Sequence, residues 1–228
     1  ASDSGIEAGS IQERGLEKIL RVQDIALENK LPFVHLVESA GANLMRYKVD
    51  GFVLGGGIFR NLTRLSKAGI PVITVQHGSG TAGGAYMPGL SDIVVMVRKR
   101  SRAFLAGPPL LLAATGEIAS EEELGGAEMH TSLSGLGEYL AEDDRHAMAL
   151  ATKLLSFLPQ NNIADPPHIL DKAVDIAIDP VMNDLVPASA KEPLDVLAVI
   201  NRLVDDGDFF EIMPDFAKNI VTGFGRIG

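Results

Sequence analysis

The feature that most constrains the fold is a series of short, mostly apolar runs. Three of them are Phe33–Val37, Pro71–Val75 and Ile93–Val97, and Ala103–Leu105 is a shorter fourth. Strands covered on both faces read as continuous apolar runs, whereas half-exposed strands alternate. Helical segments with short connections separate the runs, which favours a parallel sheet flanked by helices. The sequence therefore predicts an α/β domain.

The helical segments are bounded by caps, glycines and prolines. Ser10–Glu13 has the pattern of a capping box and predicts a helix to Asn29, with Pro32 beyond it. A loop or short helix is expected up to Val53, broken by Gly55–Gly57. Three further helices are predicted at 58–68, 143–158 and 193–205.

The domain organisation follows from one composition shift. Residues 159–167 read PQNNIADPP, a pattern typical of a linker. We expect one large domain over residues 1–160, a linker over 161–192 and the beginning of a second domain over 193–228. Residues 209–211 and 220–224 are expected to be short strands.

Charge and composition exclude several classes. The net charge of −10 is opposite to that of a nucleic-acid binder. The basic cluster Arg98–Arg102 is expected to be a solvated strand edge, and a phosphate contact is the alternative. The absence of cysteine excludes disulfides and thiolate zinc sites. Residues 1–10 lack the features of a signal peptide, and the charge-free stretch 103–116 is too short to span a bilayer. We expect a soluble protein without nucleic-acid or membrane partners.

The strongest local motif is the glycine cluster that follows the second apolar run. Gly78, Gly80 and Gly83 spell G-x-G-x-x-G, as in dinucleotide-binding loops, but the next run ends in Arg98 instead of an acidic residue. The alternative is that Gly83 and Gly84 begin a short helix. Their N–H groups would then lack internal acceptors and would form an oxyanion hole. A turn that needs glycine only for packing remains open.

Side chains for other chemistries are not arranged convincingly. Ser79 lacks the glycine two residues earlier that a nucleophile elbow needs, since His77 stands there. The Glu121–Glu123 run is expected at a helix N-terminus, and no metal site is predicted. The remaining histidines show no ligand spacing; they are His35, His130, His146 and His168. The missing acid–base pair favours chemistry in which a cofactor supplies the base.

These motifs together resemble one family. The order and spacing of several segments are similar to carboxyltransferase (beta) subunits of biotin-dependent acyl-CoA carboxylases, the propionyl-, methylcrotonyl- and acetyl-CoA carboxylase family. The segments are 81–86 (TAGGAY), Ser91-Asp92, 104–109 (FLAGPP), 114–117 (ATGE), 122–127 (EELGGA), His130, Ser134-Gly135, Asp143-Asp144 and 220–227 (IVTGFGRI).

The resemblance implies a crotonase-like (ClpP/crotonase) ββα superhelix and a site made largely of main chain. It implies that a carboxyl group passes from carboxybiotin to the α-carbon of an acyl-CoA. Gly83 and Gly84 match the oxyanion hole for the thioester enolate. The canyon for acyl-CoA and biotin matches Ala40, Gly41, Ala42, Ala82, Ala85, Tyr86, Gly107 and Pro108, the last two in a loop.

The resemblance also implies partners. Biotin would be carried by a partner protein or domain, loaded by a biotin carboxylase subunit, and the chain would assemble into a hexamer as a trimer of dimers. The location implied is the cytoplasm, or the mitochondrial matrix in a eukaryote. The chain is expected to start inside the family pattern and to end soon after the second crotonase-like domain begins.

Several alternatives stay open at this point. A biotin-dependent acyl-CoA decarboxylase subunit would share the fold and the ligand. A crotonase-type hydratase or isomerase would need a carboxylate near the glycine pair, and after Gly84 the first one is Asp92. A scaffold subunit would be expected to lose the glycine pair. Many family members also have Asp-Ser-Gly-Gly-Ala-Arg where this chain has Glu38–Asn43, so the acyl specificity stays open.

Overall fold

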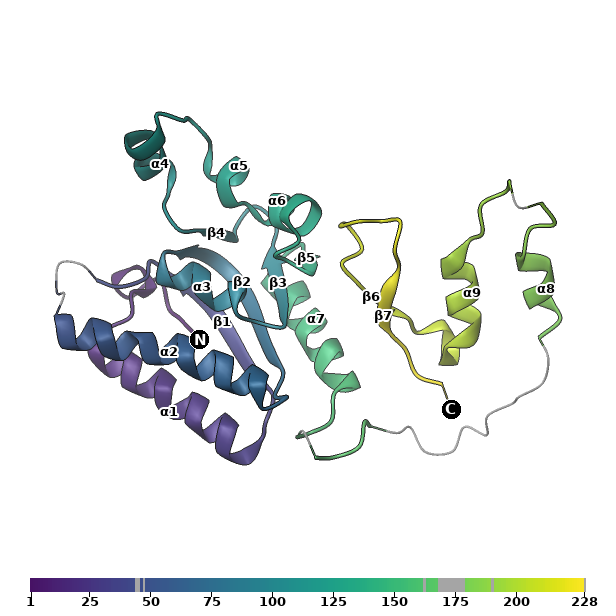
Figure 1. The fold of residues 1–228 in the computed structure, drawn as a ribbon, viewed down its shortest axis with the longest axis horizontal. Helices are drawn as coiled ribbons and strands as arrows, with labels where there is room; N and C mark the ends of the chain where they lie inside the picture. Colours follow the sequence, from purple (N-terminus) through teal and green to yellow (C-terminus); the bar gives the residue numbers. More distant parts are fainter. Residues whose placement is uncertain (44–45, 47, 162, 168–178, 190, 228) are drawn as a thin grey trace.

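A computed structural model describes residues 1–43, 46, 48–161, 163–167, 179–189 and 191–227 (Figure 1). The strands are β1 Phe33–Ser39, β2 Val72–Thr81, β3 Ile93–Val97, β4 Arg102–Phe104, β5 Tyr139–Ala141, β6 Phe210–Ile212 and β7 Thr222–Phe224. The longer helices are α1 Glu13–Asn29, α2 Val49–Lys67, α3 Gly83–Gly89, α4 Pro108–Thr115, α7 Asp144–Phe157 and α9 Val196–Leu203. The shorter ones are η1 Glu7–Gly9, α5 Glu121–Gly125, α6 Ala127–Met129, η3 His130–Ser134, α8 Val181–Leu185 and η4 Asp205–Gly207.

The predicted parallel sheet is confirmed. Its order is β1-β2-β3-β5, and β4 pairs with the carboxyl-terminal part of β2 beyond β3. Every pairing in this sheet is parallel, including the one between β3 and β5. The apolar runs do not reveal β5, whose three residues are Tyr139–Ala141.

Helices cover both faces of the sheet (Figure 1). α1 and α2 pack on one face, and their core joins Leu16, Ile58, Leu62 and Leu65 to Phe33 and Val37 of β1. α7 packs on the other face, with Ala147 and Ala151 against Val95 and Val97 of β3. Burial on both faces explains the apolar runs of β2 and β3, whereas residues of β1 alternate between buried and half-buried.

The predicted break at Gly55–Gly57 is wrong, because α2 runs through all three glycines. Each glycine in a helix interior costs about 1 kcal/mol relative to alanine. The cost is offset by burial of Ile58, Leu62 and Leu65 against the sheet and α1. Gly57 also lets α1 approach closely, since a Cβ there would lie 3.1 Å from Leu20 Cδ2. Tertiary packing therefore overrides the local preference.

The predicted capping box at Ser10–Glu13 is also wrong. α1 begins at Glu13 with Gln12 at the N-cap position, and no side chain caps it. Instead, Ile11 forms a bridge with Ala42, and its N–H donates to the carbonyl of Gly41. The preceding segment is thus held next to the end of β1. A complete capping box occurs further on, where Ser120 and Glu123 begin α5.

A stack of aromatic rings joins the carboxyl-terminal β6–β7 hairpin to α7. The ring of Phe157 stacks on Phe210 at 6.0 Å and on Phe224 at 5.7 Å between centroids. The Arg226 guanidinium lies 4.3 Å from the Phe157 centroid and donates to the Ser156 carbonyl at 2.6 Å. The hairpin therefore docks on α7 around the Phe157 ring, and Phe210 also stacks on Tyr139 of β5 with 4.9 Å between centroids. The predicted linker 161–192 includes residues outside the described ranges, so the domain division stays a prediction.

Replacing Phe157 with alanine is expected to detach this hairpin. Losing a partly buried phenylalanine from a stacked cluster costs about 2–3 kcal/mol. Hydrogen exchange should therefore become faster at the amides of β6 and β7 while β2 and β3 keep their protection. Leu133→Ala is the control, because Leu133 is exposed and lies outside the stack. Equal protection of the hairpin in the Phe157 variant would contradict this account.

Candidate active site

The glycine motif is mostly strand instead of loop. β2 continues to Thr81, and Ser79–Thr81 pair with β4. A Cβ at Gly78 would collide with the Glu38 carboxylate at 2.2 Å, and one at Gly80 would lie 2.6 Å from Gln76 Nε2. Close packing thus explains both glycines. The dinucleotide interpretation fails, because its phosphate loop must start directly after the first glycine.

The turn from β2 into α3 supplies the predicted main-chain donors. Ala82 adopts φ 51° and ψ −115°, an unusual backbone conformation for a residue with a Cβ, and its N–H donates to the Phe104 carbonyl at 3.2 Å. α3 then begins at Gly83, as predicted. Gly83 and Gly84 are its first two residues, so their N–H groups have no hydrogen-bond acceptor within the helix.

The loop after β1 lies directly against this turn. Gly41 has φ +82°, and a Cβ there would lie 2.9 Å from the Thr81 carbonyl and 3.5 Å from Gly83 N. Its N–H donates to Ser39 Oγ at 3.1 Å, and Ser39 Oγ in turn donates to the Gly9 carbonyl at 2.8 Å. The structure thus brings the two predicted segments, 40–42 and 82–86, together at the carboxyl ends of neighbouring parallel strands, where ligand sites collect.

The predicted residues differ in accessibility. Ala40, Ala42 and Ala82 are exposed, and Tyr86 is 49% exposed. Gly83 is half-buried, whereas Gly84 is buried, with its missing Cβ pointing to the Ser39 carbonyl at 2.6 Å. A ligand at this turn therefore meets Gly83 more directly than Gly84.

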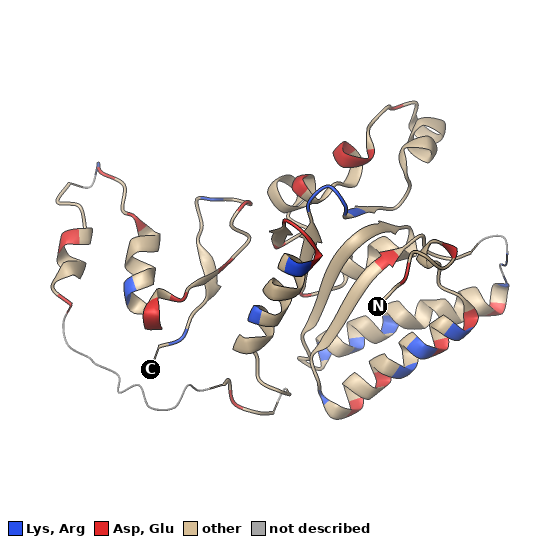
Figure 2. Ribbon diagram, turned by 180° about the vertical axis from the view of Figure 1, so that it is seen from behind, with Lys and Arg blue, Asp and Glu red and all other residues tan. Residues whose placement is uncertain are grey.

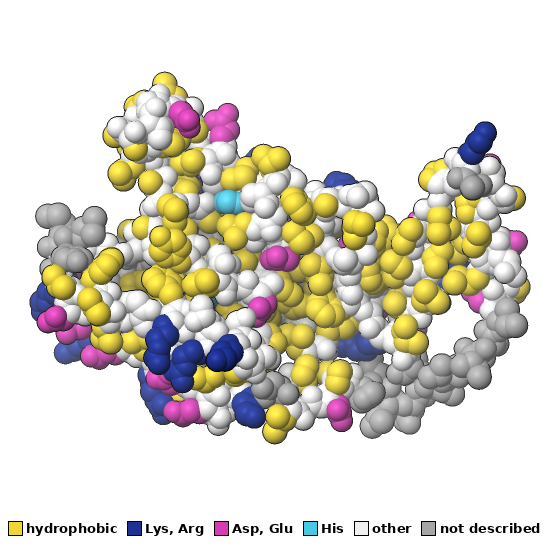
Figure 3. All heavy atoms as spheres, viewed as in Figure 1, with side chains coloured by type: hydrophobic (Ala, Val, Ile, Leu, Met, Phe, Trp, Pro, Cys, Tyr) yellow, Lys and Arg dark blue, Asp and Glu magenta, His cyan; other side chains and the backbone are white. Residues whose placement is uncertain are grey.

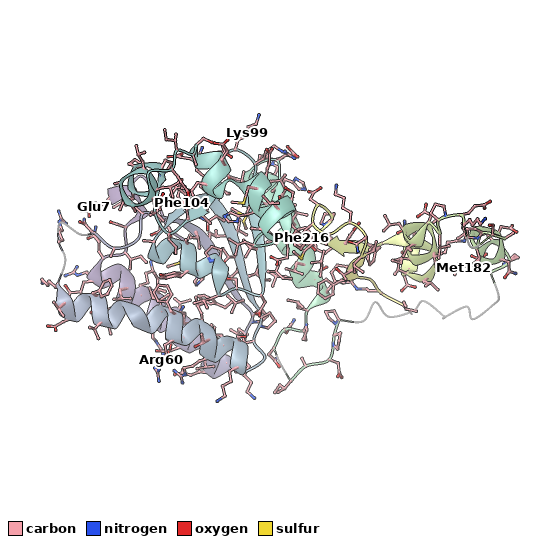
Figure 4. All side chains as sticks on the ribbon, turned by 45° about the horizontal axis from the view of Figure 1, so that its top comes forward. Glu7, Arg60, Lys99, Phe104, Met182 and Phe216 are labelled. Atoms are coloured by element: carbon pink, nitrogen blue, oxygen red, sulfur yellow. The ribbon has the colours of Figure 1, made fainter. Side chains whose placement is uncertain are left out.

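The third predicted segment lies in a different element from the one expected. Gly107 is the N-cap of α4 and Pro108 is its first residue, so the predicted loop is wrong for Pro108. Proline suits this position, because its ring fixes a helical φ where the N–H has no helical acceptor. Phe104, labelled in Figure 4, joins the segments: its carbonyl accepts from Ala82, and its ring lies 3.6 Å from the Cβ position of Gly107.

One acid–base pair joins the ends of β1 and β2. His77 Nδ1 lies 3.6 Å from Glu38 Oε2. His77 lines a hollow with Met148 of α7. The Glu38 side chain occupies the space that a Cβ of Gly78 would take, where the pairing of β1 with β2 shifts between Val37 and Ser39. The pair is therefore held at the irregular ends of these two strands.

The other singled-out polar residues have structural partners. His130 is buried, with Nε2 2.8 Å from the Ala103 carbonyl and Nδ1 2.7 Å from Ser134 Oγ. Burial lowers the pKa of His35 to about 4. Asp92 accepts from Val72 N–H at the opposite end of β2 from Gly83. Within the described ranges, no three histidine or acidic residues are grouped as a metal site. His168 lies outside the described residues.

The basic cluster is neutralised by ion pairs, which favours the solvated-edge interpretation. Arg98 pairs with Glu128 and Glu142, and Arg100 pairs with Asp144 at 2.6 Å. Arg102 contacts Glu121 and Glu122 at 3.0 and 2.9 Å. Figure 2 shows this basic turn beside acidic segments, and Figure 4 shows Lys99 projecting from the molecule. Among the described helices, none combines the length and apolar character needed to cross a bilayer.

The fold and the glycine turn define a crotonase-like α/β domain: a parallel sheet covered on both faces, with a main-chain turn at the carboxyl end of β2. The chain belongs to the carboxyl transferase domain family, whose family model matches residues 1–228.

Known relatives cover all or nearly all of the chain. A probable biotin-dependent acyl-coenzyme A carboxylase beta2 subunit of Mycobacterium tuberculosis is 44% identical over 227 residues, which is 100% of this chain and 42% of that protein. A methylmalonyl-CoA decarboxylase subunit alpha of Veillonella parvula is 37% identical over 231 residues, 99% of this chain and 44% of that protein. The transcarboxylase 12S crystal structure, with hydrolysed methylmalonyl-coenzyme A bound, matches with a TM-score of 0.91 and 35% identity over 98% of this chain and 44% of that chain. The chain thus spans less than half the length of these relatives.

Proposed function

We propose that this chain is the acyl-CoA-binding part of a biotin-dependent carboxyltransferase, which moves a carboxyl group from carboxybiotin to the α-carbon of an acyl-CoA. The observation that carries the proposal is the contact between the loops after β1 and β2, which leaves main-chain N–H groups at an open, apolar turn. The family to which the chain belongs and the transferase and carboxylase names of its relatives support it.

In this proposal, the chain holds and activates the thioester. Carboxybiotin, on a partner carrier, supplies the carboxyl group and the base. The Gly83 N–H, with Gly84 behind it, donates to the thioester oxygen and stabilises the negative charge of the enolate. Gly41 and its neighbours Ala40 and Ala42 lie against the same ligand. The loop after β1 can lie this close to the turn only because Gly41 has no side chain, since a Cβ there would collide with the Thr81 carbonyl.

The position of Asp92 argues against a hydratase or isomerase. Such chemistry needs a general acid or base within hydrogen-bond reach of the substrate. Asp92 binds the start of β2, whereas the glycine turn follows its end, which is about 30 Å away for a ten-residue strand. Asp92 therefore does not serve a thioester at Gly83.

Partners follow from the same proposal. The biotin carrier and its carboxylase would be separate subunits or domains, and the chain would assemble as a hexamer. The hexamer assembly of transcarboxylase 12S supports the oligomer. The methylmalonyl-CoA decarboxylase relative marks the second candidate direction, removal of the carboxyl group. Partner subunits would distinguish the two directions.

Carboxyl transfer is expected in reverse with free biotin as acceptor. The full-length protein is incubated with biotin and, separately, with malonyl-CoA, methylmalonyl-CoA and longer carboxyacyl-CoAs. In this direction the enolate leaves and biotin accepts the carboxyl group. One of these carboxyacyl-CoAs should therefore lose its carboxyl group only when biotin is present. The product is the corresponding acyl-CoA, measured by chromatography. A folded oligomer that transfers from none of them would overturn the proposal.

A further inference from the structure

The pairing of β1 with β2 is interrupted close to the point where both strands end. Val37 pairs with Gln76, and the next pair is Ser39 with Gly80. Between these pairs β1 advances by two residues and β2 by four, so Glu38 alone lies opposite three residues of β2. Such an irregularity disrupts the ladder of backbone hydrogen bonds. We call this interruption the strand break.

The His77–Glu38 pair spans the strand break. His77 Nδ1 of β2 lies 3.6 Å from Glu38 Oε2 of β1, and the two side chains are 21% and 23% exposed. The carboxylate has room there because Gly78 lacks a side chain, whose Cβ would collide with it. The two groups attract each other when the imidazole is protonated, and partial burial protects this attraction from screening by salt. A side-chain contact thus joins the strands where the ladder is interrupted.

The surroundings of His77 direct it toward Glu38. Its Nε2 is buried and has no hydrogen-bond partner within the described ranges. The hollow of about 230 Å³ that His77 lines also contains Met148 and Asp144 of α7, and Asp144 is paired with Arg100 at 2.6 Å. Figure 3 shows mainly hydrophobic and uncharged side chains over α3, the helix that follows the glycine turn. The charged pair at the strand ends contrasts with this apolar surface.

The residue that follows Glu38 contacts both parts of the candidate site. The Ser39 carbonyl lies 2.6 Å from the position that a Cβ of Gly84 would take, and Ser39 Oγ accepts from the Gly41 N–H at 3.1 Å. A shift of Glu38 relative to His77 would therefore move Ser39 and change the spacing between the two loops. Misplacing a reacting group by about 1 Å can lower a rate by about 100-fold.

We propose that His77 and Glu38 are positioning residues: their ion pair closes the strand break and fixes the spacing between the loop at Gly41 and the turn at Gly83. The inference rests on the proposed function, which places the thioester at Gly83. Neither side chain touches the substrate in this account. Stabilising the enolate depends on the position of the N–H group more than binding the rest of the acyl-CoA does. Loss of the pair therefore lowers turnover and leaves acyl-CoA affinity nearly unchanged.

The test compares the full-length protein with three variants. His77→Leu removes the ion pair and keeps a side chain of similar bulk, whereas His77→Lys restores a cation that can reach Glu38. Met148→Leu is the matched control, since Met148 lines the same hollow and carries no charge. The values of kcat and KM are measured per folded oligomer for transfer to biotin from the carboxyacyl-CoA that transfers best. Hydrogen exchange at the amides of residues 39–42 provides a readout that needs no transfer.

We expect His77→Leu to lower kcat by about tenfold or more, to leave KM within about threefold, and to speed exchange at residues 39–42. His77→Lys should recover about half of the lost kcat and slow the exchange again, and Met148→Leu should behave as the unsubstituted protein. An unchanged kcat in His77→Leu, an effect on KM alone, or no recovery in His77→Lys would overturn the inference. Absence of transfer by the unsubstituted protein would instead refute the proposed function, and unchanged exchange in His77→Leu would then refute the inference separately.

Discussion

Replacing Gly84 with valine is expected to destabilise the domain and to abolish the proposed carboxyl transfer together. A Cβ at this position would lie 2.6 Å from the Ser39 carbonyl oxygen and 3.3 Å from Ser39 Cβ. The colliding oxygen belongs to the backbone of β1, whose register with β2 fixes it. Overpacking a filled site costs about 1–3 kcal/mol, and the two added methyl groups place valine at the upper end. The thermal midpoint should fall by about 10 °C.

This expectation differs from what the sequence alone predicts. From the sequence, a valine at Gly84 is expected to fill the oxyanion position, with little effect on folding. The structure shows that the missing Cβ of Gly84 points at Ser39 and that the residue is buried. The glycine is therefore required by the contact between two strand ends, and the position of the N–H depends on that contact.

Gly83→Ala is the matched control for this prediction. A Cβ at Gly83 would make an ordinary contact with Phe59 at 3.5 Å, so the thermal midpoint should stay within about 2 °C of the unsubstituted protein. Both midpoints are measured on the full-length protein beside the biotin-dependent transfer assay. A Gly84→Val protein that keeps its midpoint would show that β1 and β2 separate easily here, and the account of the turn would be wrong.

The elements that the sequence predicts well are those with strong local signals. The apolar runs at 33–37, 72–75 and 93–97 are buried strands, and Asp143 caps the helix that follows it by accepting from His146 N–H. The glycine pair 83–84 is found at the start of a short helix. In each case the local preference and the tertiary environment agree, so the prediction holds.

The elements that the sequence misses depend on contacts between distant residues. β2 extends through Gly78 and Gly80 because β4, more than twenty residues later, pairs with it. α2 persists through Gly55–Gly57 because α1 and the sheet cover its buried side. The collision that makes Gly84 necessary involves Ser39, which lies 45 positions earlier. Local propensity carries no information about such partners.

A second large effect is expected from Glu138, a half-buried carboxyl group at the amino-terminal edge of the sheet. Its Oε2 accepts from Val94 N–H at 2.6 Å. Nearby, Asp92 accepts from Val72 N–H at 2.8 Å. Both acids line a cavity of about 450 Å³ whose other walls include Ile70, Ile73, Leu158, Ile212 and Phe224. Burial in these surroundings raises the pKa of Glu138 from its ordinary 4.5 to about 7; the Asp92 charge adds to this rise, and the N–H donors oppose it.

The direction of the pH effect follows from proton uptake. Between pH 4.5 and 7 the folded chain keeps the Glu138 proton, whereas the unfolded chain releases it. The stabilisation from Glu138 is therefore fully present below pH 4.5 and is lost as the pH rises through about 7. The complete shift corresponds to about 3 kcal/mol. Because the group is only half-buried, solvent screening reduces our expectation to about 1–2 kcal/mol.

His35 has the opposite effect over an overlapping range. Burial lowers its pKa from 6.5 to about 4, so the unfolded chain binds this proton first as the pH falls. The stabilisation from neutral His35 is present above pH 6.5 and is lost as the pH falls toward 4. In the unsubstituted protein the two slopes therefore partly cancel, and the pH dependence of its stability does not isolate Glu138.

Glu138→Gln isolates the carboxyl group, because glutamine still accepts from Val94 N–H and does not titrate. His35 is present in both proteins, so its contribution cancels in the difference. We expect the two proteins to have the same urea midpoint near pH 4.5. As the pH rises to 7.5, the unsubstituted protein should lose about 1–2 kcal/mol of unfolding free energy relative to the variant. This difference between the two proteins should stay constant above that pH. A difference that is independent of pH would mean that Glu138 titrates normally and that the cavity admits enough water to solvate its charge.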